Sequence, residues 1–173
     1  MNKIYPVFFI LLISSLLFSA DLSKGYKGIT LGMSKQQVQD NLKTNPDFRG
    51  DREEILTVRI EPDKEIISTE GTGYIKNGYF HFYNDKLFQI FLVLDEKKIG
   101  YYLLLKNNTE KFGKPSKLDP KSATWQDNEV RIVIEKDCTV KYFYLPVWDD
   151  LVKKDRSSDD VVVKTRNDFV NGL

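Results

Sequence analysis

The spacing of the hydrophobic residues changes along this chain, from a dense apolar stretch at the start to alternating and helical spacing further on. Residues 1–20 carry Lys3, then an apolar stretch over 7–18 that two serines interrupt, and they end on Ala20. This order predicts a signal peptide that is cleaved after Ala20. The stretch falls short of the roughly 20 residues that cross a bilayer, so we expect no membrane span after processing. Asp21 stands where a lipoprotein would carry its cysteine, and a periplasmic or secreted protein is expected.

A helix over 35–44 is predicted by the residues at its start. Ser34 can act as the N-cap and Gln37 occupies the capping-box position, while Met33 and Val38 are spaced as a hydrophobic staple. Pro46 limits its continuation.

Four strands are expected to follow this helix. The β-prone runs 55–60 and 65–69 flank a turn at 62–63, and the runs 79–83 and 87–94 flank a hairpin turn at 84–86. Alternation along these strands predicts one buried face that carries Phe80, Phe82, Phe88, Ile90, Leu92 and Leu94.

The second half of the chain repeats this plan. A helix over 98–112 is predicted from apolar residues at helical spacing, and Gly113 with Pro115 marks its end. Its buried side is expected to carry Tyr101, Leu104, Leu105, Asn108 and Phe112. Strands are predicted at 122–125, 130–135 and 139–145, and Pro146 is expected to end the regular structure.

The predicted fold is therefore α+β, with two helix-plus-antiparallel-strand units, about 28–95 and 98–145, that form one sheet with helices on one face. A single domain over 21–148 is expected, followed by a polar C-terminal tail over 149–173. The mixed charges of 153–160 are typical of a solvated linker. Residues 161–163 and 169–170 are expected to form either one short docked element or no ordered structure.

The composition of the chain narrows the range of possible functions. Cleavage after Ala20 leaves 153 of the 173 residues, and removal of Lys3 balances 25 basic against 25 acidic residues. A neutral chain has no electrostatic attraction to nucleic acid or to an anionic membrane surface. Cys138 is the only cysteine, so no intrachain disulfide can form, and the eleven Phe and nine Tyr predict an aromatic-rich core.

Short motifs in both halves resemble a known envelope family. Residues 28–42 resemble the opening of the BamE/SmpA family of small outer-membrane assembly proteins, and residues 79–90 resemble that family's closing hairpin. The segment 112–115 with Trp125 is similar to a further unit of this kind, as in the β-lactamase-inhibitor-protein group. The resemblance implies the fold and almost nothing of the function. The chain departs from the family pattern in lacking a lipid-attachment cysteine and in having a long segment over 45–78.

Signatures of catalysis are lacking in the sequence. His81 lies in a predicted strand and is expected to be an ordinary sheet residue rather than a base or ligand. Cys138 lies at a predicted hairpin bend, far in sequence from His81. No P-loop, dinucleotide-binding turn, nucleophile elbow or calcium-loop spacing is found. We expect no enzyme activity, no catalytic or metal-binding residues and no cofactor.

The sheet face turned away from the helices is the remaining candidate for a functional surface. A partner-binding face is predicted there, and its candidate residues are Tyr79, His81, Tyr83, Phe91, Tyr142 and Tyr144. A protein-binding or adaptor module with an envelope protein partner is the first hypothesis. The alternative is a small-molecule or lipid-binding protein with a pocket between helices and sheet. Packing of the same aromatics under residues 45–78 or under the tail remains open, and the sequence does not predict the oligomeric state.

Overall fold

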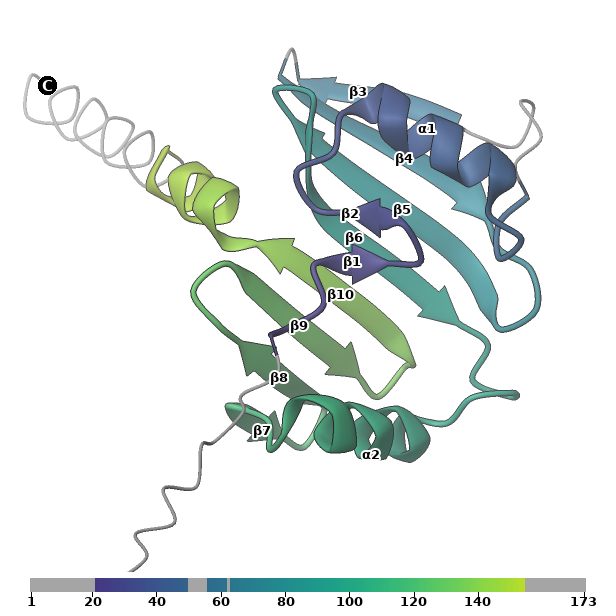
Figure 1. Ribbon diagram of the computed structural model, residues 1–173, viewed down its shortest axis with the longest axis vertical. Coiled ribbons are helices and arrows are strands. Elements are labelled where there is room, and N and C mark those ends of the chain that lie inside the picture. Colours follow the sequence, from purple (N-terminus) through teal and green to yellow (C-terminus); the bar gives the residue numbers. More distant parts are fainter. Residues whose placement is uncertain (1–20, 50–55, 62, 155–173) are drawn as a thin grey trace, which may run out of the picture.

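The computed structural model describes residues 21–49, 56–61 and 63–154, which form one eight-stranded antiparallel sheet with the helices over 35–44 and 101–112 on one face (Figure 1). The sheet order is β3-β4-β5-β6-β10-β9-β8-β7, and a separate two-stranded hairpin is formed by β1 and β2. The predicted α+β class is confirmed. The elements are β1 Gly25–Tyr26, β2 Ile29–Thr30, α1 Lys35–Thr44, β3 Leu56–Glu61, β4 Lys64–Glu70, β5 Ile75–Tyr83, β6 Lys86–Leu94, α2 Tyr101–Phe112, β7 Lys117–Asp119, β8 Ser122–Gln126, β9 Val130–Glu135 and β10 Thr139–Tyr144.

Two four-stranded units make up the sheet. Strands β3 to β6 follow one another in the first unit and β7 to β10 in the second, and antiparallel pairing of β6 with β10 joins the units. Helix α1 precedes the first set of strands and α2 the second. Both helices lie on the near face of the sheet in Figure 1, and the β1–β2 hairpin lies between them over the centre. Ile29 of this hairpin is fully buried.

The start of α1 confirms the predicted capping box. The Ser34 hydroxyl accepts a hydrogen bond from the Gln37 backbone N–H at 3.3 Å, and the Gln37 side chain accepts one from the Ser34 N–H at 2.9 Å. Val38 and Leu42 are the buried residues of this helix. Helix α2 begins at Tyr101, three residues later than expected, because the carbonyl of Asp95 binds the N–H groups of residues 98 and 99 in a separate turn.

The β5–β6 hairpin differs from the prediction in its turn and its register. Asn84 and Asp85 have φ angles of 48° and 60°, so they form a two-residue turn rather than one of three. A β-bulge then places Phe82 opposite Leu87 and His81 opposite Gln89. The predicted placement of Phe88 with the core residues is wrong, because the bulge turns it to the other side of the sheet.

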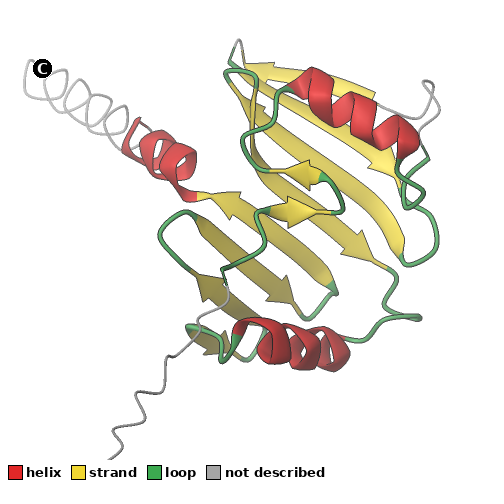
Figure 2. Cartoon of the chain, viewed as in Figure 1, coloured by secondary structure: helices red, strands yellow, loops and turns green. Residues whose placement is uncertain are grey.

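The predicted end of regular structure at Pro146 is also wrong. A helix over residues 145–154 follows β10 directly (Figure 2). Proline is tolerated in the first turn of a helix, since its fixed φ suits the helix and its missing N–H would have no intrahelical partner there. The helix therefore runs through the expected boundary at 148 and into the expected polar tail. Strand β7 is a further element that the sequence did not indicate. The predictions for 1–20, 155–160, 161–163 and 169–170 lie outside the described residues.

Large apolar side chains fill the space between the helices and the sheet. Phe48 packs edge-on against Phe80, with ring centroids 5.7 Å apart, and against Tyr26 at 6.3 Å. This contact places residues 45–49 on the helix side, and much of the remaining 45–78 segment forms β3, β4 and part of β5. The described part of the segment thus belongs to the sheet and its helix side rather than forming a cover over the far side. The largest fully buried side chains are Phe80, Phe82, Ile29, Leu42, Ile67, Leu87, Ile90, Leu92, Ile132, Ile134, Val38 and Val130.

Candidate binding face

The side of the sheet turned away from α1 and α2, here named the second face, carries Tyr79, His81 and Tyr83 from β5. Strand register adds residues from the neighbouring strands: Phe91 lies opposite Tyr79, and Gln89 lies between His81 and Phe143. The predicted grouping of Tyr79, His81, Tyr83 and Phe91 on one face agrees with this register.

Tyr142 and Tyr144 do not belong to the second face, so the prediction that they share it is wrong. Tyr142 is the register partner of Ile90 and Ile132, which are both buried in the core, and both tyrosines pack against that core. Burial raises the pKa of the Tyr142 phenol to about 12. Alternation along β10 therefore presents Phe143 to the second face, and the sequence alone did not reveal how β10 is aligned with β6.

Ring contacts connect the second face into an aromatic row. The row consists of Phe88, His81, Phe91, Phe143 and Trp148, with successive centroid distances of 6.4, 4.9, 5.9 and 5.3 Å. Lys141 lies beside the row, with its ammonium 5.2 Å from the Phe91 ring centre and 2.8 Å from a Glu135 carboxylate oxygen. The sequence search missed Phe88, Phe143 and Trp148. The bulge brings Phe88 to this face, the register of β10 on β6 brings Phe143, and the helix over 145–154 brings Trp148.

Helix 145–154 contacts the second face at two points. Trp148 packs on Phe143, and the Lys154 ammonium donates to the Tyr83 hydroxyl and lies 5.1 Å from the Tyr83 ring centre. Leu145 and Leu151 are buried, although neither belongs to the main core. Leu145, Trp148 and Leu151 are spaced by three residues, which places them along one side of the helix. The tail thus covers part of the second face, which was the alternative left open by the sequence.

Burial controls the charge of His81. Loss of solvent lowers the pKa of its imidazole from 6.5 to about 4, so the ring is neutral at pH 7. Among the described residues, the structure shows no hydrogen bond from either ring nitrogen. His81 is thus an uncharged member of the aromatic row.

Cys138 lies on the opposite side of the sheet from His81. It is buried in the core at the β9–β10 turn, has a φ of 62°, and its thiol donates to the Ile99 carbonyl at 3.2 Å. Burial is the main cause that raises the pKa of the thiol. The fold does not bring the two side chains together for Cys–His chemistry.

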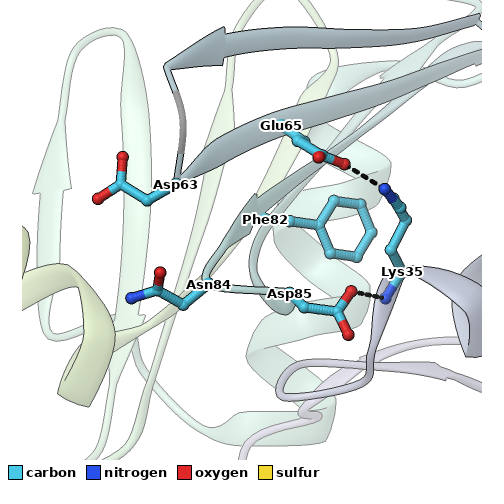
Figure 3. Close-up of a pocket in the computed structure, with 6 residues that line it drawn as sticks. All are labelled: Lys35, Asp63, Glu65, Phe82, Asn84 and Asp85. Carbon is cyan, nitrogen blue, oxygen red and sulfur yellow. Dashed lines mark hydrogen bonds and ion pairs between the residues drawn. The ribbon is translucent and has the colours of Figure 1, made fainter.

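Two clefts in the described part of the chain are lined by residues at the ends of strands. Figure 3 shows one of about 210 Å³ beside the start of α1, where the Lys35 ammonium lies 2.5 Å from Glu65 and the Lys35 N–H donates to Asp85 at 3.0 Å. Its cation and two of its carboxylates thus already have partners within the chain. Another, of about 480 Å³, is lined by Lys121, Ser122, Glu135, Lys136 and Asp137. Within residues 21–49, 56–61 and 63–154, no group of three or more His, Cys, Asp or Glu side chains could hold a metal ion.

The fold defines a single-sheet α+β domain built from two helix-plus-strand units. The family model of the TP0088 domain matches residues 24–154, and the chain belongs to that family. No curated protein and no solved structure matches the chain. Searched over the described residues, the structure contains no helix with the length and hydrophobicity needed to cross a membrane.

Proposed function

We propose that this protein is an exported, non-enzymatic binding or adaptor module that docks an envelope protein on the second face of its sheet. The observation that carries the proposal is the apolar character of this face. Val58 is 56% exposed there, and Tyr79 and Phe91 are half-buried. An antiparallel sheet with one face in water normally alternates apolar and polar residues, whereas here aromatic rings stand on the outer face of the central strands.

The chemistry of the face favours a protein partner. Tyrosine and other aromatic side chains supply much of the binding energy at protein interfaces, because they bury a large area at a low entropic cost. Tyr79 and Phe91 are partly exposed, so their rings offer contact area to a partner in addition to the part of the second face that helix 145–154 covers. The alternative of a ligand pocket between helices and sheet receives less support, because fully buried side chains fill that space.

Export and an envelope location are supported by the sequence. Residues 1–20 have the order of a signal peptide, and Asp21 replaces a lipidation cysteine. The resemblance of residues 28–42 and 79–90 to the BamE/SmpA family supports a partner in the envelope. Neither catalytic chemistry nor a cofactor is part of the proposal.

Val58 and Leu103 are exposed aliphatic side chains on opposite sides of the molecule, and they provide a matched test of the proposal. Val58 lies on the second face and is 56% exposed, and Leu103 lies on α2 and is 51% exposed. Both Val58→Asp and Leu103→Asp should melt within a few degrees of the wild type, since surface substitutions change stability by only about 0.5 kcal/mol. In capture from the envelope fraction, Val58→Asp should lose the partner and Leu103→Asp should keep it. Loss with Leu103→Asp alone would place the interface on the helix side and refute the proposal.

A further inference from the structure

Strands β3 and β7 form the two edges of the eight-stranded sheet (Figure 1). Edges of monomeric proteins are usually short or charged, because their outward backbone groups can pair with the strand of another chain. Strand β7 has both protections, since it has three residues and an ion pair between Lys117 and Asp119 at 3.0 Å. Strand β3 has six residues and no proline, and its charges and its bulge occur only from Arg59 onward. Among the described residues, β3 is therefore the less protected edge.

Both faces of the sheet are open at the middle of β3. Thr57 lies opposite the core residue Ile67, so its side chain is on the helix side, and Val58 lies opposite Ile66 on the second face. Both side chains are exposed, that of Val58 to 56%. Neither side chain is covered in a way that would block a strand from approaching this edge.

Hydrogen bonds at the two ends of β4 show the direction of its backbone groups. The Asp63 carbonyl accepts from the Asn84 N–H, and the Gly71 N–H donates to the Lys76 carbonyl. Both bonds join an odd-numbered residue of this strand line to the β5 side. Because the direction of backbone groups alternates along a strand, the even-numbered residues of β4 bond to β3.

The outward backbone groups of β3 follow from its register with β4. Val58 lies opposite an even-numbered residue of β4, so its N–H and C=O groups are used within the sheet. Thr57 and Arg59 lie opposite odd-numbered residues, so their N–H and C=O groups point away from the sheet.

We infer that two copies of this chain pair through β3, with antiparallel strands related by a two-fold axis at Val58, and form one continuous sheet. In this register Thr57 of one copy lies opposite Arg59 of the other. Their outward groups exchange both backbone hydrogen bonds, and the two-fold axis repeats the pair. Val58 lies opposite Val58 of the second copy, at the closer kind of antiparallel pair, and the contact covers its exposed side chain.

The edge is complementary to itself in this register. Pairing centred on Arg59 would place two like charges opposite each other, which destabilises antiparallel strands. Pairing centred on Val58 avoids this and uses the outward groups of both Thr57 and Arg59. A single strand pair is smaller than a standard stable interface, so we expect a weak, concentration-dependent dimer. This inference goes beyond the proposed function and does not depend on it.

The β7 edge provides a matched control. Bonds from the N–H of residue 127 to the carbonyl of 130, and from that of 136 to 121, turn the odd-numbered residues of β8 toward β9. Leu118 lies opposite Ala123, so its own N–H points outward, as that of Thr57 does on β3. Its side chain is 62% exposed, close to that of Val58.

Sedimentation equilibrium of the purified protein alone tests the dimer. The wild type should dimerise at a concentration on the order of 0.1 mM, as a small interface allows. Thr57→Pro removes an outward N–H and keeps the bonds to β4, since proline is tolerated at edge positions of this kind. It should weaken the dimer by about tenfold or more, because each copy loses one interchain donor. Leu118→Pro should leave the dimer unchanged.

Disulfide formation tests the register and remains informative if Thr57→Pro does not fold. Val58→Cys should give a disulfide-linked dimer on mild oxidation, because the two-fold axis places the two thiols opposite each other. Leu118→Cys should give little of this product, and the native Cys138 is buried.

A wild type that stays monomeric at this concentration would overturn the inference. Equal dimerisation of the wild type and Thr57→Pro would also overturn it, as would equal disulfide yields from Val58→Cys and Leu118→Cys. No envelope partner is present in these experiments, so a monomeric result would leave the proposed function to be judged by partner capture.

Discussion

Lowering the pH from 7 to 4.5 should destabilise the protein through His81, whose ring contacts Phe91 at 4.9 Å and Phe88 at 6.4 Å within the aromatic row. Burial holds the folded-state pKa of this imidazole at about 4, while an unfolded chain has the ordinary value near 6.5. Between these two values the unfolded chain binds a proton that the folded chain does not. Stability must therefore fall as the pH falls through this window.

The size of the effect follows from the two pKa values. A difference of one pKa unit corresponds to about 1.4 kcal/mol, so the full separation is worth on the order of 3 kcal/mol below pH 4. Most of this, about 2–3 kcal/mol, should already be lost at pH 4.5. Above pH 7 the ring is neutral in both states, and His81 contributes no pH dependence there.

Urea unfolding at pH 7 and pH 4.5 measures the contribution of His81 to the free energy of unfolding when the wild type is compared with His81→Phe. Phenylalanine preserves a ring in the row and cannot take up a proton, so the other titrating groups cancel in the comparison. We expect the wild type to lose about 2–3 kcal/mol more than the variant over this interval. Equal losses in the two proteins would show that His81 is solvated in the folded state and would contradict its burial in the aromatic row.

Two further predictions concern the start of the mature chain and its first helix. Ser34→Ala should cost about 1 kcal/mol in urea unfolding, and adding Gln37→Ala should cost less than the sum of the single changes, because the two residues cap each other. Full additivity in this cycle would contradict the reciprocal cap. The mature protein from the periplasmic fraction should begin at or near Asp21, and an intact mass that includes residues 1–20 would contradict the predicted signal peptide.

Elements that depend on local chemistry were predicted closely. The reciprocal cap of Ser34 and Gln37 placed α1 at its observed start, and Gly113 marked the end of α2 with a φ of 80°. Asn84 and Asp85 identified the β5–β6 turn, because both tolerate positive φ. Such signals lie within a few residues of each other and need no knowledge of the rest of the fold.

Features that depend on contacts across the sheet could not be predicted in the same way. A β-bulge changed the side on which Phe88 lies, and period-2 counting cannot detect an extra residue in a strand. The register of β10 on β6 decided that Phe143, and not Tyr142, faces outward. Pro146 was interpreted as the end of the regular structure, although proline suits the first turn of a helix equally well. The candidate site therefore kept its β5 and β6 residues and exchanged its β10 tyrosines for Phe143 and Trp148.

Site-specific photo-crosslinking in the intact envelope tests the central claim, that the second face binds a partner, most directly. A photoreactive phenylalanine analogue can replace Tyr79 on the second face or Tyr102 on α2, which is 75% exposed. The greater exposure of Tyr102 makes it the easier position to crosslink by chance, so it is a stringent control. The account predicts one discrete crosslinked protein from position 79 and none from position 102. A discrete product from position 102 with none from position 79 would contradict it.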